Sequence, residues 1–206
     1  MTPLALYLDK LGIKLSGSDL NTNNFLNLLK KQGVNITKKQ ENGELFGAKT
    51  IVVSSAIKKN NKELCQAREQ NLSVLHRAEL LKIIAEHHLL ISVTGTHGKT
   101  STTGLIAHTL NACHKKTNAI IGASLLTPYL SPTLCGEDRT CVIELDESDG
   151  SFQNFKPDVS IITNIEEDHL DFYGSYENLK EVFVRFIKNL NEQSFLILGY
   201  QQNLSE

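Results

Sequence analysis

The seven residues from 94 to 100, Thr-Gly-Thr-His-Gly-Lys-Thr, carry two glycines, a lysine and hydroxyl groups in an order suited to binding phosphate. An apolar run precedes them and a helix-prone run follows, which predicts a turn between a strand and a helix. Backbone N–H groups in such a turn bind phosphate oxygens, and the dipole of the following helix strengthens the attraction. Lys99 adds a mobile positive charge, and the Thr100 hydroxyl can bind Mg²⁺. The residues expected to hold a nucleotide are Gly95, Thr96, His97, Gly98, Lys99, Thr100 and Ser101.

This loop is shorter than the usual Gly-x-x-x-x-Gly-Lys-Thr motif, because Val93 stands where that motif has its first glycine. Gly-Lys-Thr is a common tripeptide, so a helix start without any ligand is the competing interpretation. The strand and helix predicted on either side favour nucleotide binding. His97 either contacts the ligand or orders the loop.

Two acidic clusters follow, Val-Ile-Glu-Leu-Asp-Glu-Ser-Asp-Gly-Ser-Phe from 142 and Thr-Asn-Ile-Glu-Glu-Asp-His-Leu-Asp from 163. Each comes at or just after a predicted buried strand, and the carboxyl ends of parallel strands face the ligand crevice. A carboxylate beside a bound triphosphate is a hard oxygen ligand suited to Mg²⁺. We therefore expect Glu144 and His169 to be functional. The same reasoning leaves Glu147, Glu166 and Glu167 as solvated loop residues or helix caps.

Apolar runs alternate with amphipathic segments, which predicts an α/β protein with a mainly parallel sheet. Strands are expected at 13–16, 34–37, 50–54, 89–93, 140–145, 158–164 and 195–198. Helices are expected at 75–88, 100–113 and 175–190, and a loop at 123–139, where Pro and Gly recur.

A boundary near residues 86–90 divides the chain into a first region, 1–87, and a second region, 88–206. The first region opens with a helical pattern, continues into a strand and reaches Asp19, the order found in dinucleotide-binding folds after their first strand and Gly-rich turn. Asp19 then occupies the place of the acidic residue that contacts a ribose hydroxyl. The expected fold is a Rossmann-like region with its first strand missing, followed by an incomplete α/β domain with a phosphate-binding loop.

The composition excludes several classes of function. A net charge of −2 gives no sign of a nucleic-acid partner, and no apolar run has the length of a membrane span. The N-terminus lacks a signal peptide, and the cysteines form no Cys-x-x-Cys pair, so we expect a cytoplasmic protein with reduced thiols. The four cysteines are Cys65, Cys113, Cys135 and Cys141.

Taken together, these motifs resemble the Mur ligase family of peptidoglycan synthesis over essentially the whole chain. The short phosphate loop at 94–100, the Glu-Leu-Asp-Glu-Ser-Asp-Gly-Ser-Phe segment at 144–152 and the segment at 163–171 match three of its signatures. Ser-Gly-Ser-Asp at 16–19 and Ser-Ser-Ala-Ile at 54–57 match its UDP-binding domain, which implies UDP-sugar binding by Asp19, Ser54 and Ser55. His97 indicates the branch that joins L-alanine to UDP-N-acetylmuramate or its recycling relative, and Ser148-Asp149 favours the first of these two.

The resemblance implies an ATP-dependent amide-forming ligase. Lys99 and the backbone from Gly95 to Ser101 would hold the ATP phosphates, Thr100 and Glu144 would bind one Mg²⁺, and His169 would help to bind a second. The family transfers the γ-phosphoryl group to the muramate carboxylate, and the amine of L-alanine then attacks the acyl phosphate.

The family also has a Gly-rich loop before the position of Met1 and further domains after that of Glu206, so we expect an internal segment that does not turn over alone. Three alternatives remain open. The first is the related ligase that recycles a preformed tripeptide, and the second is a non-catalytic nucleotide-binding remnant. The third is an unrelated phosphate-loop switch or ATPase.

Overall fold

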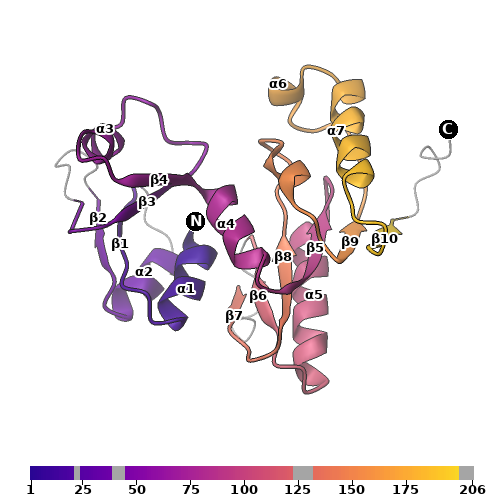
Figure 1. Ribbon diagram of the computed structural model, residues 1–206, viewed down its shortest axis with the longest axis horizontal. Coiled ribbons are helices and arrows are strands. Elements are labelled where there is room, and N and C mark those ends of the chain that lie inside the picture. The colour runs from indigo at the N-terminus through magenta and orange to yellow at the C-terminus, as the bar shows by residue number, and fades with distance from the viewer. Residues whose placement is uncertain (21–23, 39–44, 123–131, 200–206) are drawn as a thin grey trace. The chain divides into compact units, whose positions relative to one another are not determined.

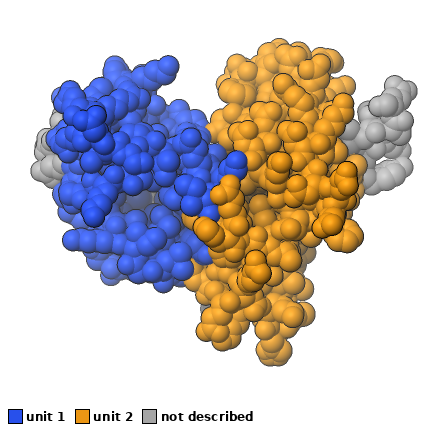
Figure 2. Space-filling view, viewed as in Figure 1, with its two compact units in different colours: residues 1–83 blue, residues 84–206 orange. Residues whose placement is uncertain are grey.

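The computed structural model describes residues 1–20, 24–38, 45–122 and 132–199. By its internal contacts the chain divides into two compact units, residues 1–83 and residues 84–206 (Figure 2). The two units are described separately below. Among the described residues, no helix has both the length and the apolar character needed to cross a membrane.

Unit 1 is built from short helices and short parallel strand pairs (Figure 1). Its elements are α1 (Thr2–Lys10), β1 (Ser16–Ser18), α2 (Asn24–Lys31), β2 (Asn35–Thr37), β3 (Thr50–Val53), α3 (Lys62–Glu69), β4 (Ser73–His76) and the greater part of α4 (Arg77–Ala85). β1 pairs with β2 and β3 with β4, in two separate two-stranded sheets. Leu4, Leu6 and Tyr7 of α1 are buried, and α1 packs against α2.

Unit 2 contains a six-stranded sheet in the order β10-β9-β5-β8-β6-β7. Its elements are β5 (Leu89–Thr94), α5 (Lys99–Ala112), β6 (Asn118–Ile120), β7 (Thr133–Leu134), β8 (Thr140–Glu144), η1 (Ser151–Asn154), β9 (Val159–Ile162), α6 (Leu170–Tyr173), α7 (Tyr176–Lys188) and β10 (Phe195–Leu198). Only β7 runs antiparallel to its neighbour among these described strands. The predicted α/β class with a mainly parallel sheet is confirmed.

The helices of unit 2 bury apolar faces against the sheet and against each other. α5 packs on β5 and β8, and Ala107 of α5 joins a core with Ala119, Ile121 and Val142. In α7, apolar residues at helical spacing are buried, and Phe152 of η1 packs on Phe183 and Phe186 with ring centroids 4.8 and 5.2 Å apart. This packing holds the segments after β8 and β9 in place.

The position of β5 decides where the site lies. β5 pairs with β8 on one side and with β9 on the other, in parallel register. Val93 lies opposite Glu144, and Thr94 lies opposite Ile162. The residues that follow all three strands therefore emerge at one edge of the sheet, which is where open α/β sheets bind ligands.

Several predicted boundaries were wrong. The first strand was expected at 13–16 but is β1, Ser16–Ser18, because pairing with β2 rather than apolar content forms it. The helix expected at 75–88 starts as β4, since Val74 and Leu75 pair with β3 before α4 begins. β6 was not predicted, and β7 lies in the expected loop at 123–139, of which residues 123–131 are outside the described part. β6 and β7, with three and two residues, carry too little periodicity to be recognised.

Candidate functional site

The loop between β5 and α5 has the backbone that the glycines predict. Gly95 has φ 121° and Gly98, which caps the N-terminus of α5, has φ 79°. Both angles lie in the region that residues with a Cβ rarely adopt. The first N–H groups of α5 have no acceptor within the helix, so the helix start offers donors to an anion.

The segment after β9 fixes one side of this loop through hydrogen bonds. The N–H of Thr96 donates to Asn164 O at 3.0 Å, and the N–H of His97 donates to Asn164 Oδ1 at 2.8 Å. The Thr163 hydroxyl donates to His97 O at 2.6 Å. The Glu166 N–H donates to Thr96 Oγ1 at 2.9 Å. Sequence reasoning did not predict this role for Thr163 and Asn164, because the interactions join positions about 70 residues apart.

Lys99 is folded back over its own loop. Its Nζ donates to Gly95 O at 2.6 Å, to Thr96 O at 3.0 Å and to Glu147 Oε1 at 2.8 Å. The side chain is only 15% exposed. The ammonium group of the lysine predicted to bind phosphate therefore lies against the loop and has three hydrogen-bond acceptors around it.

Thr100 and Glu144, predicted to share a metal ion, lie next to each other. The Thr100 hydroxyl donates to Glu144 Oε1 at 3.1 Å, and the Gly122 N–H donates to Glu144 Oε2 at 2.7 Å. A Cβ on Gly122 would lie 2.5 Å from Glu144 Oε1, so the carboxylate sits tightly against that backbone. The result is a pair of hard oxygen atoms at the start of α5.

Glu147 contradicts its expected role as a solvated loop residue. Its side chain is 1% exposed and its Oε1 lies 2.8 Å from Lys99 Nζ and 3.5 Å from His169 Nε2. Burial raises the pKa of this carboxyl group, and the hydrogen bond and charge of Lys99 partly offset the rise. The charge of Glu147 predicted exposure to solvent, whereas the structure buries its side chain beside Lys99 and His169.

Tyr173 fixes the backbone at Glu147. Its hydroxyl donates to Glu147 O, and the Gly150 N–H donates to the same oxygen at 3.0 Å. Burial, followed by the charge of Glu147, raises the pKa of Tyr173, so the phenol keeps its proton and remains a donor. His169, at φ 52°, begins α6 and lies 35% exposed beside Glu147.

The remaining residues of this group are on the surface. The side chains of His97 and Glu166 are 65% and 57% exposed, and His97 Nε2 lies 3.7 Å from Glu166 Oε2. Ser101 and Glu167 are exposed as well. The backbone of His97 orders the loop, while its ring faces solvent.

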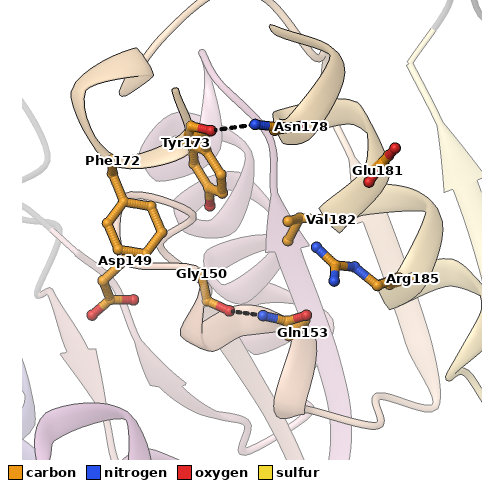
Figure 3. Close-up of a pocket in the computed structure, with 9 residues that line it drawn as sticks. All are labelled: Asp149, Gly150, Gln153, Phe172, Tyr173, Asn178, Glu181, Val182 and Arg185. Carbon is orange, nitrogen blue, oxygen red and sulfur yellow. Dashed lines mark hydrogen bonds between the residues drawn. The ribbon is translucent and has the colours of Figure 1, made fainter. Parts of the chain in front are cut away.

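A pocket of about 320 Å³ is lined in part by Tyr173 (Figure 3). Two amide side chains close parts of its wall, since Gln153 Nε2 donates to Gly150 O and Asn178 Nδ2 donates to Tyr173 O. The residues predicted for nucleotide and metal binding are not among those that line it: Asp149, Gly150, Gln153, Phe172, Tyr173, Asn178, Glu181, Val182 and Arg185.

The predicted UDP-sugar residues lie in unit 1, at strand ends. Asp19 directly follows β1, and its N–H donates to Thr37 O at 3.1 Å. Ser54 and Ser55 follow β3, and Ser55 Oγ lies 3.3 Å from His76 Nε2. Since the Ala78 N–H donates to His76 Nδ1, Nε2 of the neutral ring carries the proton and donates to the serine. This pairing makes His76 a donor rather than a base for Ser55, a role that the sequence did not predict.

The donor set of unit 2 fits Mg²⁺ and a phosphate group. Thr100 and Glu144 present the oxygen ligands that Mg²⁺ prefers, and Glu147 Oε2 is buried without a hydrogen-bond partner among the described residues. The described side chains contain no cluster of three or more His, Cys, Asp or Glu residues around one point. Mg²⁺ usually keeps only one or two protein carboxylates and takes its other ligands from water and phosphate, so this sparse set suits it.

Comparison with known proteins agrees with this geometry. Residues 93–206 match the family model for the Mur ligase middle domain, and residues 1–89 match that for the Mur ligase family, catalytic domain. The chain is 38% identical over 205 residues to UDP-N-acetylmuramate–L-alanine ligase of Pelagibacter ubique, covering 98% of this chain and 44% of that protein. The ligase of the same name from Ruthia magnifica is 40% identical, with 92% and 40% covered.

Solved structures show the same fold. The crystal structure of UDP-N-acetylmuramate-alanine ligase from Thermotoga maritima superposes with a TM-score of 0.87 at 26% identity, covering 96% of this chain and 46% of that one. A ligase from Neisseria meningitides, named for UDP-N-acetylmuramate and L-alanyl-gamma-D-glutamyl-meso-diaminopimelate, shares the fold with a TM-score of 0.84 at 22% identity, covering 98% and 68%. The chain spans 40–44% of the length of these curated relatives. With its phosphate loop, its paired acidic segments and both family models matched in order, the chain belongs to the Mur ligase family.

Proposed function

We propose that this chain provides the UDP-sugar-binding and ATP-binding parts of a ligase that joins L-alanine to UDP-N-acetylmuramate. One observation carries the proposal. The loop at 94–100 is held against residues 163–166, with Lys99 at its mouth and the Thr100–Glu144 pair at the start of α5. A phosphate group there meets backbone donors, a lysine and oxygen ligands for Mg²⁺ on the same edge of one sheet.

We assign residues 1–87 to the UDP-sugar and residues 88–206 to ATP. In the first part Asp19, Ser54 and Ser55 would contact the nucleotide sugar. In the second, the backbone from Gly95 to Ser101 and the side chain of Lys99 would hold the phosphates. The order of the two matched family models, at 1–89 and 93–206, supports this assignment.

The chemistry begins with a carboxylate, which is a poor electrophile until one of its oxygens becomes part of a good leaving group. The carboxylate oxygen of UDP-N-acetylmuramate attacks the γ-phosphorus of ATP, and the bond to ADP breaks. The amine of L-alanine then attacks the acyl carbon, loses a proton and expels phosphate. Lys99 offsets the repulsion between the two anionic substrates and stabilises the phosphoryl group during transfer.

The same site would hold Mg²⁺. Thr100 and Glu144 would bind one ion, and His169 would help to bind a second. When bound, the ions neutralise charge that develops on the phosphate oxygens. Glu144 is already oriented for this by the Gly122 N–H.

The recycling ligase, which adds a tripeptide to the same nucleotide sugar, is a second candidate. The fold shared with the Neisseria meningitides protein keeps it open. Ser148 and Asp149, in the acidic segment after β8, favour L-alanine as the acceptor.

The test is a titration of the 206-residue chain with Mg²⁺·ATP and with UDP-N-acetylmuramate, followed by product analysis with L-alanine or tripeptide. Micromolar nucleotide binding that is weakened but still measurable in Lys99→Met supports the site. Amide product with L-alanine or with tripeptide distinguishes the two ligases. Binding without product supports a nucleotide-binding segment, and phosphate release without the muramyl substrate contradicts the ligase proposal.

A further inference from the structure

All three N–H groups of the Lys99 ammonium already have an acceptor, so none is available for a phosphate. An ammonium carries three N–H groups. Lys99 Nζ has three acceptors within 3.0 Å: the carbonyls of Gly95 and Thr96 and the carboxylate of Glu147. A phosphate oxygen can therefore reach Lys99 only if one of these contacts is given up.

The three acceptors differ in charge and in place. The Gly95 and Thr96 carbonyls are neutral and belong to the loop that carries Lys99. Glu147 belongs to the segment after β8, and its carboxylate is the only charged acceptor of the three. A phosphate oxygen, also negatively charged, competes with that carboxylate for the same ammonium group.

Glu147 is held where this competition takes place. Its backbone carbonyl accepts hydrogen bonds from Tyr173 and from the Gly150 N–H, so its main chain is fixed by groups other than Lys99. His169 Nε2 lies 3.5 Å from the Oε1 atom that Lys99 contacts. The carboxylate thus keeps a polar neighbour after Lys99 has left.

We propose that Glu147 is a positioning residue that binds Lys99 in the nucleotide-free protein. When the nucleotide binds, one of its phosphates replaces the Glu147 carboxylate as the partner of Lys99. The inference rests on the proposed binding of ATP at the loop. It predicts that Glu147 opposes nucleotide binding through Lys99 specifically, while keeping the lysine folded over the loop until the phosphate arrives.

The experiment is a double-mutant cycle with Lys99→Met and Glu147→Gln in the 206-residue chain. The non-hydrolysable analogue AMP-PNP with Mg²⁺ is titrated by calorimetry into wild type, both single variants and the double variant. Glu192→Gln, an exposed carboxylate on the turn before β10, is the matched control for loss of one charge. We expect Glu147→Gln to tighten binding about tenfold when Lys99 is present and less than twofold in Lys99→Met.

Two binding results overturn the inference. Equal tightening with and without Lys99 means that Glu147 acts only by general repulsion of the anion. Weaker binding in Glu147→Gln with Lys99 present means that the carboxylate supports the bound position of the lysine. Glu147→Asp, which withdraws the carboxylate by one methylene, repeats the test if the Gln variant does not fold; it should tighten binding in the same direction.

A second readout does not depend on affinity. In thermal unfolding without nucleotide, the effects of the two substitutions should be non-additive, because each removes the same contact. At saturating AMP-PNP they should be additive. If wild type binds no adenine nucleotide, the proposed function fails and the inference with it. If wild type binds and neither cycle shows coupling, only the inference fails.

Discussion

The hydroxyl of Thr163 donates a hydrogen bond of 2.6 Å to the carbonyl of His97, 66 residues earlier in the chain. It also lies 3.2 Å from Thr94 O, so one side chain binds the strand end and the phosphate loop together. The loop conformation is thus imposed by a neighbouring strand as well as by its own glycines. Preorganised donors are worth more to a ligand than donors that must first be ordered.

Thr163→Val should loosen this connection. The variant loses the hydrogen bond to His97 O and the polar contact with Thr94 O, and we expect the free energy of unfolding to fall by about 1–2 kcal/mol. AMP-PNP should bind several-fold more weakly, because the loop must be ordered on binding. Chemical denaturation and calorimetry measure the two effects. Thr109→Val, on the exposed face of α5, is the control, and equal effects of the two variants would disprove a specific role for Thr163.

Gly95→Ala should be among the most damaging small changes in the loop. A Cβ there would lie 2.4 Å from Thr163 Oγ1 and 2.7 Å from Asn164 O, in addition to the strain of φ 121°. We expect a loss of about 2–4 kcal/mol in unfolding free energy. Gly98→Ala has φ 79° but nothing within 4 Å, so strain alone should cost about 1–2 kcal/mol. A larger loss in Gly98→Ala would contradict the close approach at Gly95.

Glu144→Gln tests the metal assignment. The amide keeps the size of the side chain and an oxygen for the Gly122 N–H, but it removes the charge that attracts Mg²⁺. Nucleotide affinity measured with Mg²⁺ should fall roughly 10–100-fold, whereas affinity measured in EDTA should change little. Glu137→Gln, in an exposed pair with Lys116, should leave both values unchanged. An equal loss with and without Mg²⁺ would point to a structural role for Glu144.

The cysteines should react with a thiol reagent in an order set by burial. Cys113 and Cys135 are exposed, whereas Cys141 lies fully buried in β8. Burial raises the pKa of Cys141 to about 12, so it stays a thiol at pH 8, and only the thiolate is nucleophilic. Peptide mass spectrometry after labelling at pH 8 should find Cys141 unmodified until denaturant is added. Labelling of Cys141 as fast as Cys135 would contradict this packing.

Hydrogen exchange should distinguish the two units. The described part of unit 1 has two separate two-stranded sheets, and a two-stranded sheet by itself is only marginally stable. In unit 2, Val93, Val142 and Ile143 are completely buried within a six-stranded sheet. Amides of β5 and β8 should exchange roughly 100-fold or more slowly than those of β1 and β3. Equal protection of β3 and β8 would show that unit 1 is as stable as unit 2.

Much of the framework could be predicted from local patterns. Buried strands followed by glycine, lysine and acidic residues indicated a parallel sheet with functional groups at the carboxyl ends of its strands. The pairing of β5 with β8 and β9 agrees with that prediction. Thr100 and Glu144, 44 residues apart, were expected to share a metal ion from the resemblance to the Mur ligases, and their hydrogen bond agrees with that expectation.

Short elements escaped prediction for a physical reason. β1, β6 and β7 have two or three residues each and are formed by their partners, whereas periodicity needs a longer segment to emerge. β4 was taken into a helix because its apolar residues also fit the helical period of α4.

The sequence by itself determined which residues could bind phosphate and metal, because glycine turns, a lysine and carboxylates after strands are local features. Only the tertiary structure decided which of these residues contact one another. Glu147 is charged and was expected in solvent, yet its side chain is buried beside Lys99 and His169. Thr163 and Asn164 fix the loop through contacts across two strands. Burial and long-range hydrogen bonds depend on how distant segments pack, and no local pattern contains that information.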